Sequence, residues 1–269
     1  MSKKKSDKSQ HLLWKVHIKG GTWVNYIFGT MHTRDERVHA FLPHLMPYVQ
    51  DCKVLATEFH LPDPEHFPAV VFDSVPDWWE PLTAKQKKKI NILLASYNIG
   101  GIEQYTVSPP LMLMQAVTAE ILGKEAAIPL DLELALQAKS AGLRLDGIET
   151  LEEQMGILHQ IPIEKQVGQL VALSKDVRKY TRNLKNQVRW YLKQDIRQLY
   201  NDSRKQLKAL RKLLLLRRNR LMADRMAIMC GNEPHFMAIG AAHLWGDKGV
   251  LNYMRHAGYK ITPVPLHVK

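Results

Sequence analysis

Apolar runs near the two ends of the chain lead into the same short motif. Residues 26–28 precede Gly29 and His32, and residues 236–239 precede Gly240 and His243. Each motif is followed by helical spacing and then by another apolar run, at residues 54–57 and 259–264. The order strand, Gly-x-x-His turn, helix, strand predicts two βαβ units, and the two strands of such a unit lie parallel in one sheet.

The duplicated motif also predicts where function resides. Functional residues of open α/β sheets gather just beyond the carboxyl ends of the strands. Two units in one sheet would bring His32 and His243 together, although 211 positions separate them in the sequence. We expect Gly29 and Gly240 to let the chain turn tightly after each strand and aim the imidazoles over the sheet edge.

The remaining patterning predicts alternating short strands and helices. Strands are expected at 12–16 and 22–28, joined by a hairpin turn at Gly20 and Gly21, and at 53–57 and 144–148. Helices are expected at 83–97, 110–122 and 131–141, and after the capping box formed by Thr150 and Glu153. A helix is also expected at 35–49, where Pro43 and Pro47 indicate breaks or irregular turns. Residues 60–79 contain four prolines and are predicted to form a loop.

A long helical region follows, because residues 163–230 contain no proline and only Gly168. Two or three long helices are expected there, with a turn near residues 201–203. One buried helical face is predicted from the spacing of apolar residues, namely Val188, Tyr191, Leu192, Ile196, Leu199 and Tyr200.

These elements together predict an α/β fold. The duplicated βαβ halves would form a small mixed sheet, with a large helical insertion between them at approximately residues 80–230. The chain length suits a single domain over residues 11–269, preceded by a disordered basic tail at residues 1–10.

Positive charge is concentrated in one segment. The net charge of +12 arises almost entirely between residues 175 and 220, where sixteen Lys and Arg residues face three Asp residues. Such charge interleaved with an apolar helical face is usually a solvated surface, and a surface for anionic partners is the alternative.

Cysteine usage and hydropathy favour a cytoplasmic protein. Cys52 and Cys230 lie close to apolar segments and are expected to be free, buried thiols. No secretory signal peptide and no transmembrane helix are predicted, because no apolar stretch has the required length.

Two histidines and a carboxylate suffice to hold a catalytic first-row metal ion and leave a position open for water. We expect Glu58 to supply the carboxylate because it closes the apolar strand that follows the first motif. A lone Gly-x-x-His motif carries little information, so the hypothesis depends on its duplication in the same context. His-Glu-x-x-His, Cys-x-x-Cys, Gly-x-Ser-x-Gly and phosphate-loop motifs do not occur.

Several segments together resemble the TraB/GumN/Tiki family, in the wider group of erythromycin-esterase-like and ChaN-like proteins. The resemblance covers nearly everything from Leu12 to Val264. It is carried by residues 28–32, 56–58, 129–131, 147–154 and 218–223, and by the closing motif at residues 240–263.

The resemblance implies a duplicated α/β fold with a metal-dependent site formed by His32, Glu58 and His243. Arg218 and Asn219 match family positions and would contribute to catalysis, with the guanidinium holding a substrate carboxylate or an oxyanion. Asp131 and Glu149 match as well and, with Arg218, would bind substrate. Each also has a plainer explanation: Arg218 is one of sixteen cations, and Asp131 and Glu149 lie beside helix starts.

The resemblance implies a metallohydrolase that cleaves peptides or another small carbonyl substrate, with manganese, cobalt or zinc as the ion and Glu58 as ligand or general base. An extracellular peptide substrate is not expected, since the chain shows no secretion signal. Two other functions remain open: a basic helical module for nucleic acid or phospholipid, of which we do not expect nucleic acid, and ChaN-like binding of haem or metal.

Overall fold

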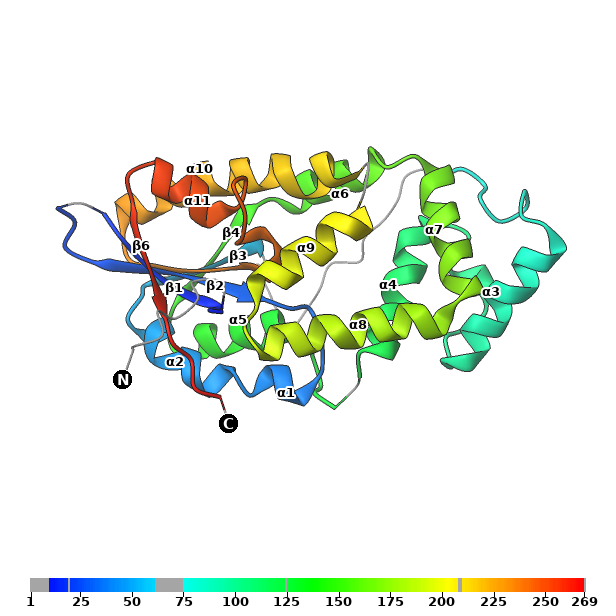
Figure 1. Ribbon diagram of the computed structural model, residues 1–269, viewed down its shortest axis with the longest axis horizontal. Helices are drawn as coiled ribbons and strands as arrows, with labels where there is room; N and C mark the ends of the chain where they lie inside the picture. The colour runs from blue at the N-terminus through cyan, green and yellow to red at the C-terminus, as the bar shows by residue number, and fades with distance from the viewer. Residues whose placement is uncertain (1–9, 19, 61–74, 124, 208–209, 269) are drawn as a thin grey trace, which may run out of the picture.

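The computed structural model describes residues 10–18, 20–60, 75–123, 125–207 and 210–268. Its described residues include a six-stranded mixed sheet with the strand order β4-β3-β5-β2-β1-β6 (Figure 1). The strands are β1 (Leu13–His17), β2 (Val24–Thr30), β3 (Val54–Phe59), β4 (Arg144–Glu149), β5 (His235–Gly240) and β6 (Lys260–Val264). The predicted α/β class with a small mixed sheet is confirmed.

Both predicted βαβ units are present, although neither consists of adjacent strands. β5 pairs in parallel with β2 on one side and with β3 on the other, so it separates the two strands of the first unit. β1 is antiparallel to both β2 and β6, so β6 runs parallel to β2 and therefore to β5. β6 lies at the edge of the sheet, separated from β5 by β2 and β1. Interleaving of the units pairs Thr30 directly with Gly240, the residues at the ends of the two motif strands.

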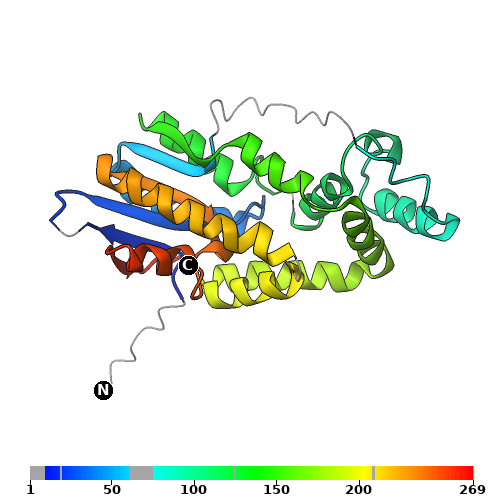
Figure 2. The same ribbon diagram turned by 90° about the horizontal axis from the view of Figure 1, so that it is seen from above.

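Helices cover both faces of the sheet (Figures 1 and 2). One layer contains α10 (Arg218–Asn232) and α11 (Val250–His256), and the other contains α2 (Leu42–Gln50) and α5 (Leu130–Ser140), with α1 (Glu36–His39) beside them. The strands are buried on both faces because of these layers, and residues 235–239 of β5 are buried without interruption.

A second group of helices lies beyond the carboxyl end of the sheet. It contains α3 (Ala84–Ser96), α4 (Pro110–Ile121) and α7 (Ile163–Lys175), which enclose a separate apolar cluster around Ile90, Leu93, Leu113 and Leu170. The long helix α8 (Val177–Leu192) runs from this group back to the sheet, and α9 (Ile196–Leu207) returns alongside it (Figure 1). The capping box predicted at Thr150 and Glu153 is present at the start of α6 (Leu151–His159).

Two helix predictions differ from the structure. The helix expected at residues 35–49 is broken near Pro43, as that proline indicated, into α1 and α2, because Pro43 lies in the first turn of α2 and has no N–H to continue a preceding helix, whereas Pro47 lies inside α2. The region from 162 to 230 is divided into α7, α8, α9, a π-helical segment (Lys212–Arg217) and α10. The break before α8 occurs at Asp176, whose side chain caps the N–H of Lys179.

The expected turn at residues 201–203 is also wrong, since these residues lie inside α9. The chain instead reverses at residues 193–195, where Gln194 adopts a positive φ of 55°. The Gln194 side chain donates to the Leu266 carbonyl at 2.7 Å, and Asp195 accepts from the Gln198 N–H. One tertiary and one local hydrogen bond therefore fix a turn that contains no glycine or proline.

Other predictions have mixed outcomes. Cys52 and Cys230 are free and buried, as expected. Residues 1–9 of the predicted tail, and residues 61–74 of the predicted loop, lie outside the described residues, while Gln10 forms a β-bridge with Asp195. Residues 75–79 form neither helix nor strand. None of the described helices is long and apolar enough to span a bilayer.

Candidate active site

The predicted site residues gather at the carboxyl edge of the parallel strands. Glu58 lies in β3, Glu149 is the last residue of β4, and His32 follows β2 by two positions. His243 closes a short 3-10 turn, Ala241–His243, directly after β5. The strand order β4-β3-β5-β2 therefore gathers side chains whose positions in the sequence span more than two hundred residues.

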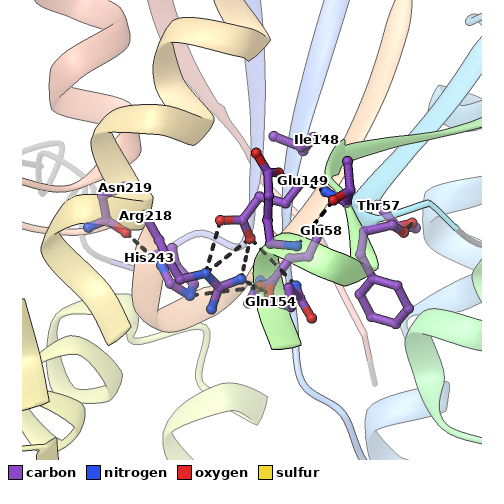
Figure 3. A network of polar contacts seen from close by, with 12 residues as sticks. Thr57, Glu58, Ile148, Glu149, Gln154, Arg218, Asn219 and His243 are labelled. Atoms are coloured by element: carbon purple, nitrogen blue, oxygen red, sulfur yellow. Dashed lines mark hydrogen bonds and ion pairs between the residues drawn. The ribbon is translucent and has the colours of Figure 1, made fainter. Parts of the chain in front are cut away.

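Glu58 is the centre of a polar network (Figure 3). Its Oε1 accepts a hydrogen bond from the Gly240 N–H at 2.6 Å, and its Oε2 accepts one from Nη2 of Arg218 at 2.6 Å. Oε1 also lies 3.8 Å from Nε2 of His243. Burial alone would raise the pKa of Glu58, but the neighbouring His243, Arg218 and Gly240 N–H outweigh it and lower this pKa to about 2. Glu58 is therefore an anion at neutral pH.

Arg218 joins two carboxylates. Its Nε donates to both Glu149 oxygens, and its Nη2 donates to Glu58 and Glu149. The Glu149 side chain is completely buried, and the Gln154 amide donates to it at 3.5 Å. Burial would lower the pKa of Arg218, but the two glutamates raise it above its ordinary value. No hydrogen bond from Nη1 of Arg218 is found among the described residues.

Asn219, the next residue of α10, fixes the tautomer of His243. Its Nδ2 donates to the Lys248 carbonyl at 2.6 Å, which leaves Oδ1 as the acceptor beside Nδ1 of His243 at 2.5 Å. Because Oδ1 can only accept, Nδ1 of His243 carries a proton, and Nε2 presents its lone pair. Burial lowers the pKa of His243 to about 4, with Glu58 acting in the opposite direction and Arg218 in the same one. The neutral form that a metal ligand requires is therefore the stable form of His243.

His32 has a different environment. Its Nδ1 lies 2.9 Å and 3.0 Å from the two oxygens of Asp131, so the carboxylate again accepts from Nδ1 and leaves Nε2 available. The side chain is 68% exposed. Desolvation would lower the pKa of His32, but the hydrogen bond and charge of Asp131, with the charge of Glu58, raise it. At a given pH a larger fraction of His32 than of His243 is protonated, so a metal ion would compete with a proton mainly at His32.

The two motif glycines serve close packing, which differs from the turn-forming role expected for them. Gly240 has a φ of −53°, and neither Gly29 nor Gly240 has a positive φ. A Cβ on Gly29 would lie 2.7 Å from Cδ1 of Leu244 and 3.0 Å from Cα of Ala241, and a Cβ on Gly240 would lie 2.9 Å from Oε1 of Glu58. Glycine therefore lets the second motif lie against the first and lets Glu58 reach the backbone of β5.

The donor chemistry fits a divalent first-row ion, and the spacing fits it in part. Glu58 and His243 are close, deprotonated at the ligating atoms and supported by outer hydrogen bonds, which are properties of metal ligands. Within the described residues, however, no group of three His, Cys, Asp or Glu side chains could hold a metal ion as it stands. Glu58 and His243 thus form a preorganised pair, and His32 does not complete a triad with them.

One supporting residue was not identified from the sequence as part of the site. Tyr191 of α8 is fully buried and donates its hydroxyl proton to the Gly29 carbonyl at 2.8 Å. It attaches the helical insertion to the first motif. Its apolar neighbours predicted a core position, and the sequence carried no signal for the hydrogen bond because 162 positions separate the partners.

Comparison with known proteins supports the predicted resemblance. The sequence model of the TraB/PrgY/gumN family matches residues 12–263, and this range contains every site residue described above. No curated protein and no solved structure matches the chain.

Proposed function

Because the chain belongs to the TraB/PrgY/gumN family, we propose that it is a metal-dependent hydrolase that cleaves peptide bonds. The divalent ion would be held by Glu58 and His243, and His32, which does not complete a triad with them in this structure, would turn toward the ion as the third ligand. The observation that carries this proposal is the preorganised pair: Nε2 of a neutral His243 lies 3.8 Å from the ionised carboxylate of Glu58.

The hydrogen bonds around the pair support metal ligation. Metal-binding histidines ordinarily donate their second ring N–H to a protein oxygen, which sets the tautomer and the ring orientation. His243 has this partner in Asn219, and His32 has it in Asp131. Both rings of the duplicated motif therefore keep Nε2 as the ligating atom.

Charge also favours a cation at this position. Glu58 is an anion, and it shares the single guanidinium of Arg218 with the buried carboxyl group of Glu149. A buried charge is costly unless it is paired or coordinates a metal. A divalent ion beside Glu58 would add positive charge to this shared arrangement.

The roles of the individual residues follow from these contacts. A bound divalent ion would acidify its water and polarise the substrate carbonyl. Nη1 of Arg218 is placed to hold a substrate carboxylate or the oxygen on which negative charge develops. Glu149 fixes Arg218 from the buried side rather than contacting substrate, and Asn219 and Asp131 orient the imidazoles.

Comparing the metal-dependent peptidase activity of the wild-type protein with that of Glu58→Gln tests this proposal. The wild-type protein should cleave unstructured peptides when manganese or cobalt is added, lose activity with a chelator, and recover it when metal is restored. Glu58→Gln keeps the side-chain size but removes the anion, so turnover should fall to background and metal content below one ion per chain. Circular dichroism checks that the variant remains folded.

The matched control is Glu36→Gln, which removes a carboxylate from the exposed first turn of α1. It should retain wild-type metal content and activity. Chelator-sensitive activity that survives intact in Glu58→Gln would show that Glu58 is neither ligand nor general base, and the proposed site would be wrong.

A further inference from the structure

A concave basic surface lies on α8, away from the site described above. A cavity of about 440 Å³ is lined by Arg178, Arg182, Lys185, Asn186 and Arg189 of α8 and by Tyr97, which follows α3. We call it the α8 basic pocket. Figure 1 shows α8 running between the sheet and the helical group that contains α3. Its volume is within the range of small-molecule sites.

The four cations form one row along the helix. Their spacing of four, three and four residues places them on one helical face, with about 5–6 Å between neighbouring Cβ atoms. The row extends over roughly 16 Å, from a rise of about 1.5 Å per residue. Buried Leu184, Val188 and Tyr191 occupy the face next to it, so packing holds the row in place.

Within the described part of the chain, three of these four cations have no acidic partner and the fourth contacts only an amide. Arg178, Arg182 and Lys185 form no hydrogen bond or ion pair with any described residue, and Arg189 donates only to Oδ1 of Asn186 at 3.2 Å. Other arginines of the same basic region are neutralised: Arg218 binds two glutamates and Arg220 binds Asp224. The pocket lining contains no acidic residue, so its positive potential is available to an anion.

The geometry points to an organic polyphosphate of the nucleotide class as the ligand of the α8 basic pocket. Four cations in a row suit several linked phosphates better than a single phosphate, which two neighbouring cations would satisfy. Tyr97 supplies an aromatic ring against which a base can pack. A membrane surface is flat and would favour a convex basic face, whereas these residues line a hollow.

The α8 basic pocket shares no lining residue with the candidate active site, but α8 links the two. Tyr191, two residues beyond Arg189, donates to the carbonyl of Gly29 in the first motif. Helix α8 thus lines the pocket with residues 178–189 and contacts strand β2 of the candidate site through Tyr191. The inference concerns ligand binding, and it stands whether or not the protein is a hydrolase.

Binding of ATP, measured by calorimetry in the presence of a chelator, tests this inference. Wild-type protein should bind ATP saturably with one ligand per chain. Arg182→Gln combined with Lys185→Gln should weaken binding by about tenfold or more, because charge-assisted hydrogen bonds are lost. Tyr97→Ala should weaken ATP binding but leave the weaker binding of inorganic triphosphate unchanged.

A matched variant controls for overall charge. Lys179→Gln combined with Lys193→Gln removes two exposed cations from α8 and its end, and neither residue lines the pocket. It should bind ATP as the wild-type protein does. The inference is overturned if this control weakens binding equally, or if no saturable ATP binding occurs. It is also overturned if single-stranded DNA or phosphatidylserine vesicles bind more tightly than ATP through Arg182 and Lys185.

Discussion

The two Gly-x-x-His motifs have the same sequence pattern and lie side by side, yet their histidines occupy opposite environments. His243 is buried, neutral and hydrogen-bonded to the amide of Asn219, and its Nε2 lies beside Glu58. His32 is 68% exposed and is paired with the carboxylate of Asp131. Duplication has preserved the position of each imidazole but not its electrostatic surroundings.

This difference divides the candidate site into a fixed half and an adjustable half. An amide partner leaves the ring neutral and adds no charge to a buried position, whereas a carboxylate partner favours the protonated ring. Burial and the amide therefore keep His243 in the neutral form that a metal ligand requires. His32 keeps the freedom to exchange a proton for a ligand, because it is exposed and its pKa is raised.

The largest expected effect is on metal affinity when each histidine is removed. His243→Ala deletes one member of the preorganised pair and should reduce affinity by more than the 100-fold limit typical of outer-shell changes. His32→Ala should have a smaller effect, because its ring must lose a proton and contributes less net binding energy. Elemental analysis after dialysis, with exposed His44→Ala as control, measures both. An equal loss in the two variants would contradict the division.

Removing the partners of the histidines should produce the next largest effect. Asn219→Ala takes away the acceptor that keeps the proton on Nδ1 of His243, so the proton can move to Nε2 and block ligation; about 10- to 100-fold loss of metal affinity is expected. Asp131→Asn still offers His32 an amide oxygen, so only a few-fold loss is expected. Calorimetric titration of manganese would compare the two, and a greater loss in Asp131→Asn would reverse our assignment.

Much of this comparison was accessible from the sequence. Each apolar strand leading to a glycine and a histidine predicted a βαβ unit, and parallel strands must end at one edge, so the placement of both motifs at one sheet edge followed from topology. Glu58 was likewise placed at this edge by its position at the end of an apolar run. These placements were accessible because strand periodicity and chain direction are local properties of the sequence.

The contacts that distinguish the two halves were not accessible, because they depend on non-local packing. Insertion of β5 between β2 and β3 is a choice among sheet orders that local patterning does not specify. The Arg218–Glu149 ion pair joins residues 69 positions apart, and Arg218 lies within a long run of cations. The reversal at Gln194 depends on a hydrogen bond to Leu266, whereas local residue preferences indicated a turn seven residues later.

Alanine at the two motif glycines should separate packing from chemistry. In Gly29→Ala the new Cβ meets the Cα of Ala241, which cannot move alone, so a loss of about 1–3 kcal/mol in the free energy of unfolding is expected. In Gly240→Ala the new Cβ meets Oε1 of Glu58, a side-chain atom that can shift, so metal affinity should fall more than stability. Denaturant unfolding and metal titration of both variants provide the measurement. Equal loss of stability would show that both glycines serve packing alone.

The smallest expected effect is a pH-dependent contribution of the His32–Asp131 pair to stability. The pKa of His32 is raised in the folded protein, so its stabilisation is complete below the unfolded value of about 6.5 and is lost as pH rises through the folded pKa. The His32 side chain is 68% exposed, and solvent screening limits the contribution of the pair to about 0.5 kcal/mol or less. Asp131→Asn should therefore lower the free energy of unfolding near pH 5.5 and have little effect near pH 8.5.

His243 should show the opposite dependence of stability on pH. Because its folded pKa is about 4, the unfolded chain binds a proton first as pH falls, and the free energy of unfolding decreases as pH is lowered from about 6.5 toward 4. Chemical denaturation of wild type, Asp131→Asn and His243→Gln across this range measures both slopes, and slopes of the same sign would mean that the two motifs do not differ electrostatically.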